Sequence, residues 1–417
     1  MLRVLLLAAA VASLVNQAPA PRRQVSRRVT RTPADVSSRR RYINLTGFPF
    51  PLGPFATRRT VRETIVKGRV WGFEQAQNLF GIAVNVRMVV VKLRSGDLWV
   101  YNPVAPTVEL LELLEEVGGN VKYVVLGTTQ YEHKIYAGPF SRKFPEASVH
   151  CVPDQYSFPL NLNPRLLGIS PTRRRSTGPG YLSEDATYGW KDEFDLKILR
   201  PEKRLAANYA AVEAAFVHRD TKTLILTDAL VNVPKQKPDV VDDETMAYLG
   251  RRDSWVLKAA AFGNWRGQQK QLQEAVRQNN SASTQDGWMR NALLALTFGP
   301  SPTTLIDPST SFNRINNKWI VPPVCESLVY ASPIVRPALK KWVEALAKLD
   351  FVRVAPSHFA VAECSPADFK NAFANVLDEQ EKNSFFRRIL GQTASLPQPD
   401  AALLGDIARV LTKFNII

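Results

Sequence analysis

Cysteine and histidine are scarce in this sequence. Of its 417 residues, three are cysteine and four are histidine. Cys151, Cys325 and Cys364 stand far apart, and no two of them form a Cys-x-x-Cys pair. This spacing fits neither a disulfide framework nor a cysteine zinc site. The simplest inference is a protein of a reducing compartment.

Acidic residues are almost missing from the first 40 positions. Eight arginines there accompany a single acid, Asp35, so this stretch holds +7 of the formal net charge of +16 and leaves +9 for the rest. The apolar run at 4–15 is too short to span a bilayer, which takes about 20 residues. Because no later segment is suitable, we expect no membrane span in the mature protein.

The N-terminal region has two parts of different composition. Residues 1–20 contain the apolar run and end in Ala18-Pro19-Ala20, which predicts a signal peptide with a small-residue cleavage site. Residues 21–45 are rich in arginine and hydroxyl residues and predict a transit-like basic segment. This arrangement resembles the two-part presequence of algae with secondary plastids and predicts a plastid (chloroplast) location. The alternative is a secreted protein with a basic propeptide.

Beyond these segments the chain alternates β-rich runs with helical patterns. Its 45% hydrophobic content is enough for a large core. We expect ordered structure from about Arg59, mainly helical structure over 240–300 around a Gln/Asn-rich insertion, and a helical C-terminal extension over 379–417. The predicted strands are at 88–93, 98–101, 121–126, 211–217, 223–226 and 351–354, the first two and the fourth and fifth forming hairpins.

Two of the four histidines follow buried strands directly. His133 comes after the strand at 121–126, with Glu132 beside it, and His358 comes after the strand at 351–354. Asp228 follows the second hairpin in the same way. Polar side chains at strand exits often carry the chemistry of α/β proteins. A lone histidine there is more often structural, but together these four residues predict a convergent cluster.

The order of these elements and motifs resembles the metallo-β-lactamase superfamily. That resemblance implies an α/β fold in which two mixed sheets flanked by helices form an αββα sandwich, here over residues 60–378. Segments such as 68–74, 86–92, 138–145 and 223–228 more narrowly resemble a plant, algal and cyanobacterial family, domain of unknown function 4336. The narrower resemblance implies the fold but no activity.

The sequence departs from the superfamily at the metal ligands. The superfamily motif His-x-His-x-Asp-His is here Thr128-x-Gln130-x-Glu132-His133, and no histidine lies between His150 and His218. We therefore expect the first of the two metal sites to be lost, and we do not assign His218, near the turn of its hairpin, as a ligand.

The four residues of the second metal site are present. By the resemblance, Glu132, His133, Asp228 and His358 would hold one zinc or iron ion, with Asp228 and Glu132 as the candidate catalytic carboxylates. Glutamate in place of aspartate adds about 1.5 Å of reach, which could turn Glu132 from a ligand into a partner that orients His133. The alternative is a degenerate site whose side chains only form hydrogen bonds with one another.

Three functions remain open at this point. The first is a plastid hydrolase-like protein with at most one metal ion, acting on a small ester, thioester or phosphoester. The second is a non-catalytic binding or assembly module with a protein partner, since a fold does not fix a function. The third is an RNA-processing enzyme, because a net charge of +9 outside the first 40 residues permits nucleic-acid binding, although the sequence contains no RNA-binding module.

Overall fold

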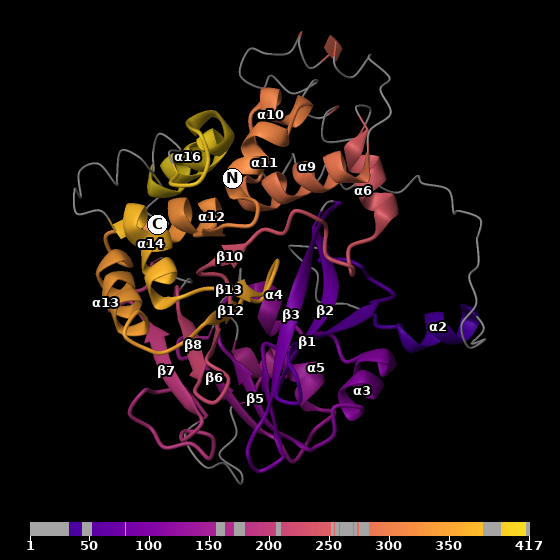
Figure 1. The fold of residues 1–417 in the computed structure, drawn as a ribbon, viewed down its shortest axis with the longest axis vertical. Helices are drawn as coiled ribbons and strands as arrows, with labels where there is room; N and C mark the ends of the chain where they lie inside the picture. Colours follow the sequence, from indigo (N-terminus) through magenta and orange to yellow (C-terminus); the bar gives the residue numbers. More distant parts are fainter. Residues whose placement is uncertain are drawn as a thin grey trace.

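The computed structural model describes residues 33–43, 52–79, 81–155, 163–170, 180–205, 210–251, 283–377 and 393–413, with a few positions between 254 and 274. Figure 1 shows two sheets with helices on their outer sides. The predicted signal peptide, most of the transit-like segment and most of the Gln/Asn-rich insertion lie outside the described residues.

The first sheet has six strands in the order β1-β2-β3-β4-β5-β6. The strands are β1 (Thr60–Val66), β2 (Val70–Leu79), β3 (Ile82–Lys92), β4 (Leu98–Tyr101), β5 (Val121–Leu126) and β6 (Ser148–Cys151). Neighbours are antiparallel from β1 to β4 and parallel from β4 to β6. The predicted hairpin at 88–101 and the predicted strand at 121–126 are confirmed, and Gly96 adopts the positive φ of 87° that the hairpin turn requires.

The second sheet has five strands in the order β13-β12-β9-β8-β7. They are β7 (Phe194–Leu199), β8 (Glu213–His218), β9 (Thr223–Ile225), β12 (Arg353–Ala355) and β13 (Ala362–Glu363). Strands β8 and β9 form the predicted second hairpin, and β12 lies parallel to β9. Since β9 and β12 run in the same direction, their carboxyl ends meet at one edge of the sheet.

The two sheets pack face to face through an aromatic core. Trp99 of β4 lies between Phe194 and Phe216 of the second sheet, with ring centroids 4.5 and 4.9 Å away. Each such aromatic pair adds about 0.5–1.5 kcal/mol beyond its buried area. The side chains of β3 alternate between the two faces of the sheet. Val89 and Val91 lie in this inner core, whereas Val90 between them packs with the outer helices.

Helices cover both outer faces. Helices α3 (Val108–Glu115) and α5 (Ala137–Ser141) pack on the first sheet through Leu110, Leu114 and Phe140. Helices α13 (Arg336–Leu346) and α14 (Pro366–Leu377) pack on the second sheet and lie at the left of Figure 1, away from α3 and α5 at the right. The predicted αββα sandwich of two mixed sheets is therefore confirmed.

A helical layer closes one end of the sandwich. It contains α6 (Asp243–Gly250), α9 (Thr284–Thr297), α10 (Pro302–Ile306), α11 (Ser309–Ile315), α12 (Pro323–Cys325) and the π-helical turn η2 (Glu326–Tyr330), together with the short strand pair β10 (Val231–Asn232) and β11 (Trp319–Ile320). Helices α6 and α9 confirm that the described parts of 240–300 are mainly helical.

Structure begins earlier than the predicted start near Arg59. Helix α2 (Pro33–Arg39) is followed by a short arm in which Arg41 pairs with Thr57 and Arg40 forms an ion pair with Glu109 of α3. The glycines and prolines at 47–54 led us to expect no regular structure before Arg59. The arm is instead held by backbone hydrogen bonds to residues 56–58, and this pairing cannot be recognised from the local sequence.

The C-terminal helix α16 (Gln398–Lys413) packs against α9 and η2. Buried Asp400 accepts hydrogen bonds from the N–H of Ser301 at 3.0 Å and from the hydroxyl of Ser311. The described part of the C-terminal extension is therefore anchored on the helical layer. Within the described residues, no helix has both the length and the apolar character that crossing a membrane requires.

Candidate metal centre

The four predicted site residues lie together at one edge of the sandwich. Glu132 and His133 are on the short helix α4 (Tyr131–Lys134) beyond β5, Asp228 is in the loop after β9, and His358 is in the loop after β12. One ligand atom from each residue lies within 4.8 Å of those of the other three. The structure thus brings all four together, and their role as metal ligands stays a prediction.

Asp228 is the centre of the cluster. Its Oδ2 is 3.4 Å from Nε2 of His133, and its Oδ1 is 3.2 Å from Nε2 of His358. The two imidazole rings meet edge to face, with centroids 5.0 Å apart. Burial raises the pKa of Asp228, but His133 and His358 outweigh this effect, and the pKa lies well below the usual carboxyl range.

The imidazole of His133 is buried next to Asp228. Its side chain is 0% exposed, and within the part of the chain that the structure describes neither Nδ1 nor Nε2 has a hydrogen-bond partner. Buried polar atoms are almost always satisfied by a hydrogen bond or by an ion. His133 is therefore the side chain in the cluster that most needs a further partner.

The backbone of β3 fixes the orientation of His358. Its Nδ1 lies 2.8 Å from the carbonyl oxygen of Asn85, and because a carbonyl only accepts, Nδ1 carries a proton. Nε2 is then the nitrogen that faces Asp228. The Asn85 side chain also accepts the N–H of Phe359 at 2.8 Å, where the backbone has a positive φ of 59°.

The pKa of His358 responds to the same surroundings. Burial lowers it, but the hydrogen bond and charge of Asp228 have the larger combined effect, so the pKa is raised. Without a metal ion, Asp228 therefore favours a protonated His358.

Asn102 ties the three ligand-bearing segments to one another. This buried residue directly after β4 accepts the N–H of Gly127 at 2.9 Å and donates to the side-chain oxygens of Thr227 at 3.0 Å and Ser357 at 3.1 Å. Thr227 and Ser357 immediately precede Asp228 and His358. We did not predict this residue, although a polar side chain directly after an all-apolar strand is the signal that singled out 128–133.

Glu213 supports the Asp228 loop from the other side. It opens β8, is buried, and its Oε1 accepts the backbone N–H groups of Thr227 and Asp228 at 2.8 and 3.2 Å. Burial and the charge of Asp228 raise its pKa to about 8, against the opposing effect of these hydrogen bonds. A lone acid at the start of an apolar strand was the available signal, and we did not use it.

The segment around Thr128 and Thr129 is held by local hydrogen bonds. Thr128 Oγ1 accepts the N–H of Gln130 at 3.1 Å, and the Thr128 carbonyl accepts from the side chain of Gln155 at 2.7 Å. Thr129 Oγ1 donates to the carbonyl of Ala210. These contacts use the segment as a turn, and the loss of the first metal site stays a prediction.

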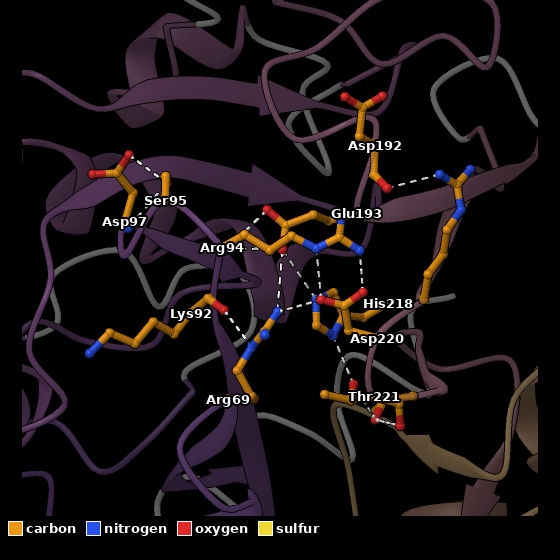
Figure 2. Close-up of polar contacts among 12 residues, drawn as sticks. Arg69, Lys92, Arg94, Ser95, Asp97, Asp192, Glu193, His218, Asp220 and Thr221 are labelled. Carbon is orange, nitrogen blue, oxygen red and sulfur yellow. Dashed lines mark hydrogen bonds and ion pairs between the residues drawn. The ribbon is translucent and has the colours of Figure 1, made fainter.

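A second group of possible ligands lies at the far end of the β8–β9 hairpin. Nε2 of His218 is 3.7 Å from Glu193, and Asp220 is nearby. Figure 2 shows Arg69 and Arg94 pointing at these carboxylates: Arg69 lies 2.9 Å from Asp220 and 3.4 Å from Glu193, while Arg94 pairs with both oxygens of Asp220. Two guanidinium groups already neutralise the carboxylates, so this group is an ion-pair network between the sheets.

The fold and the cluster define an α/β sandwich protein with a candidate metal centre at one sheet edge. A family model described as Domain of unknown function (DUF4336) matches residues 67–313 and 306–375, and the chain belongs to this family. No curated protein matches the chain.

Three solved structures illustrate what the chain is similar to. They are the metal-soaked Flv1 flavodiiron core from Synechocystis sp. PCC6803 (9% identity, TM-score 0.41, 78% of this chain and 62% of that chain), a metallo-β-lactamase from Pontibacter korlensis (12%, 0.35, 77% and 100%) and a flavoprotein from Thermotoga maritima (10%, 0.37, 77% and 62%). The chain thus spans less than two thirds of the flavodiiron core and of the flavoprotein.

Proposed function

We propose that this protein binds one zinc or iron ion through Glu132, His133, Asp228 and His358 and acts as a metal-dependent hydrolase. The observation that carries the proposal is His133, a buried imidazole whose nitrogens form no hydrogen bond among the described residues and which faces a carboxylate. A cation between these groups would satisfy both at once.

The spacing of the side chains suits such an ion. Ligands that hold zinc tetrahedrally at about 2.0–2.1 Å stand about 3.3 Å from one another. Oδ2 of Asp228 lies 3.4 Å from Nε2 of His133 and Oδ1 lies 3.2 Å from Nε2 of His358, so each carboxylate oxygen is close to that separation from one imidazole. His358 also donates its other ring N–H to a backbone carbonyl, an arrangement typical of metal-binding histidines.

Each residue has a distinct part in the proposed site. Asp228 would be the ligand next to both imidazoles, and Glu132 would be a fourth ligand or a partner that orients His133. The bound ion would polarise a carbonyl or phosphoryl oxygen and lower the pKa of water, which are the requirements for hydrolysing a small ester, thioester or phosphoester.

Metal content tests the proposal directly. The protein would be expressed without chelator and analysed by mass spectrometry for zinc and iron. We expect about one ion per chain, lost in His133→Ala and in His358→Ala. His218→Ala is the matched control, because His218 is as buried as His133 but lies outside the cluster. Equal metal content in all four proteins would overturn the assignment.

A non-catalytic binding module is the second candidate. The observation that favours it is the use of Thr128 in local hydrogen bonds at a position where the resemblance to the superfamily implies a ligand. It predicts no stoichiometric metal, even after reconstitution with zinc or iron, and a protein partner retained by the immobilised chain. One tightly bound ion per chain would count against it.

We also propose a plastid location, which rests on the composition of residues 1–45. A fluorescent protein fused behind this segment should reach the plastid of an alga with secondary plastids. Secretion of the fusion would favour a secreted protein instead. Deletion of residues 21–45 alone is the control that separates the effect of the predicted signal peptide from that of the transit-like segment.

A further inference from the structure

Glu213 is a buried acid beside the cluster that the proposed function does not use. It is 6% exposed, and it is not among the four grouped ligand atoms. Its Oε1 accepts three consecutive backbone N–H groups, those of Thr227, Asp228 and Ala229, at 2.8, 3.2 and 3.4 Å. This oxygen therefore contacts the backbone of Asp228 and of the residue on either side of it.

Three consecutive N–H groups that converge on one point form a concave donor site of the kind that binds anions. Here the acceptor comes from the protein itself. The Thr227 carbonyl accepts the N–H of Ser357 at 3.1 Å, while the N–H groups of Thr227, Asp228 and Ala229 all donate to Glu213, so this acceptor helps to set the path of the backbone. The direction in which the Asp228 side chain leaves the loop follows from that path.

The backbone of Glu213 contacts the other ligand-bearing segment. Glu213 forms an isolated antiparallel bridge with Thr128, and Ala214 N–H donates to the carbonyl of Gly127 at 2.7 Å. The segment that continues to Glu132 and His133 is thus attached to the same residue that holds the Asp228 loop. Glu213 therefore connects the segment of His133, through its backbone, to the loop of Asp228, through its side chain.

We propose that Glu213 is a positioning residue that holds Asp228 at the distance from His133 and His358 that metal binding requires. This inference rests on the proposed metal site. Oε1 is the atom responsible for the positioning, because it accepts all three hydrogen bonds from the backbone of the Asp228 loop.

Two substitutions separate the acceptor from the rest of the side chain. Glu213→Ala removes the oxygen, whereas Glu213→Gln keeps an acceptor oxygen at the same reach. Asp400→Ala is the matched control, because Asp400 is a buried acid that also accepts a backbone N–H, that of Ser301, far along the chain from the cluster. For each variant, the zinc dissociation constant of the folded protein is measured by competition with a chromophoric chelator.

We expect Glu213→Ala to weaken zinc binding by about 10–100-fold, the usual effect of removing a partner that orients a metal ligand. Glu213→Gln should restore affinity to within about threefold of the wild type. Asp400→Ala should lower the melting temperature and leave the affinity unchanged, which separates positioning from loss of stability.

The outcomes distinguish this inference from the proposed function. A wild-type protein that binds no zinc or iron would defeat the proposed function, and the inference with it. Zinc binding in the wild type with unchanged affinity in Glu213→Ala, or equal losses in the alanine and glutamine variants, would overturn the inference alone. Faster amide exchange at Thr227, Asp228 and Ala229 in the alanine variant reports the lost contacts without any metal.

Discussion

Asn102 is one buried side chain on which the geometry of the whole site depends. It bonds to residues immediately before the segments that carry His133, Asp228 and His358. Its backbone has a positive φ of 47°, a conformation that asparagine tolerates better than most residues. The side chain therefore supplies both the three hydrogen bonds and a suitable backbone at the end of β4.

Asn102→Ala should lower the free energy of unfolding by about 3 kcal/mol, since it leaves buried polar partners unsatisfied. It should also reduce the bound metal. Asn291→Ala is the control, because Asn291 is equally buried and bonds both the N–H and the carbonyl of Ala83 instead of the ligand-bearing segments. Urea unfolding and metal analysis check both variants, and unchanged metal in Asn102→Ala would contradict the role assigned to it.

His218 gives the stability of the protein a dependence on pH. Burial and the nearby guanidinium of Arg69 lower the pKa of His218 to about 4, against an ordinary value of 6.5. Between these pH values the unfolded chain binds a proton that the folded protein does not, so stability falls as pH drops from about 6.5 to about 4.

Replacing His218 by glutamine should flatten this dependence by up to about 1.4 kcal/mol per pH unit within that range. Urea unfolding of the wild type and His218→Gln between pH 4 and pH 7 is the measurement. Parallel curves for the two proteins would contradict the prediction.

At the scale of elements, α6 and α9 approach so closely that their glycines are required. A Cβ at Gly287 would lie 1.7 Å from the carbonyl oxygen of Met246, and one at Gly250 would lie 2.4 Å from that of Ser283. Backbone atoms cannot move aside as the end of a side chain can. The short distance between the two helices therefore depends on the missing side chains.

Gly287→Ala should destabilise the protein by more than about 2 kcal/mol. Helix propensity alone predicts the opposite, a gain of about 1 kcal/mol for alanine over glycine inside a helix. The steric overlap decides the sign, because it involves the backbone of the neighbouring helix. A stabilised variant in urea unfolding would show that the helices can separate at little cost.

The whole molecule is a sandwich whose sheets are joined by polar contacts at both ends of the β8–β9 hairpin. At one end, Asn102 of the first sheet reaches Thr227 and Ser357 of the second. At the other end, Arg69 and Arg94 reach Glu193 and Asp220, as Figure 2 shows. The candidate metal centre lies at the first end, where its ligands also come from both sheets.

Zinc or iron should therefore stabilise the fold as a whole. An ion that binds only the folded protein adds about 2.7 kcal/mol of stability at a free concentration of 100 times its dissociation constant. We expect the melting temperature to rise by several degrees on adding the ion and to return on chelation. The His133→Ala variant should show no such rise, and an equal rise in that variant would place the binding elsewhere.

The sequence by itself determined six of the strands and singled out the four residues that the structure brings together, but it did not predict β1, β2 or β7. The strand at 121–126 was placed to the residue because a mainly apolar run between glycine signals has few alternatives. Asp228 and His358 followed from polar residues at strand exits. Hydrophobic periodicity and turn residues are local properties of the sequence, so they predict strands without any knowledge of the tertiary packing.

Only the tertiary structure decided how those residues are supported. Asn102 contacts residues 25, 125 and 255 positions away, and Glu213 contacts a loop 14 to 16 positions away. The pairing of the arm at 41–43 and the anchoring of Asp400 are equally non-local. Such hydrogen bonds depend on which strand ends meet in space, and the parallel arrangement of β9 and β12 fixes that only once the chain has folded.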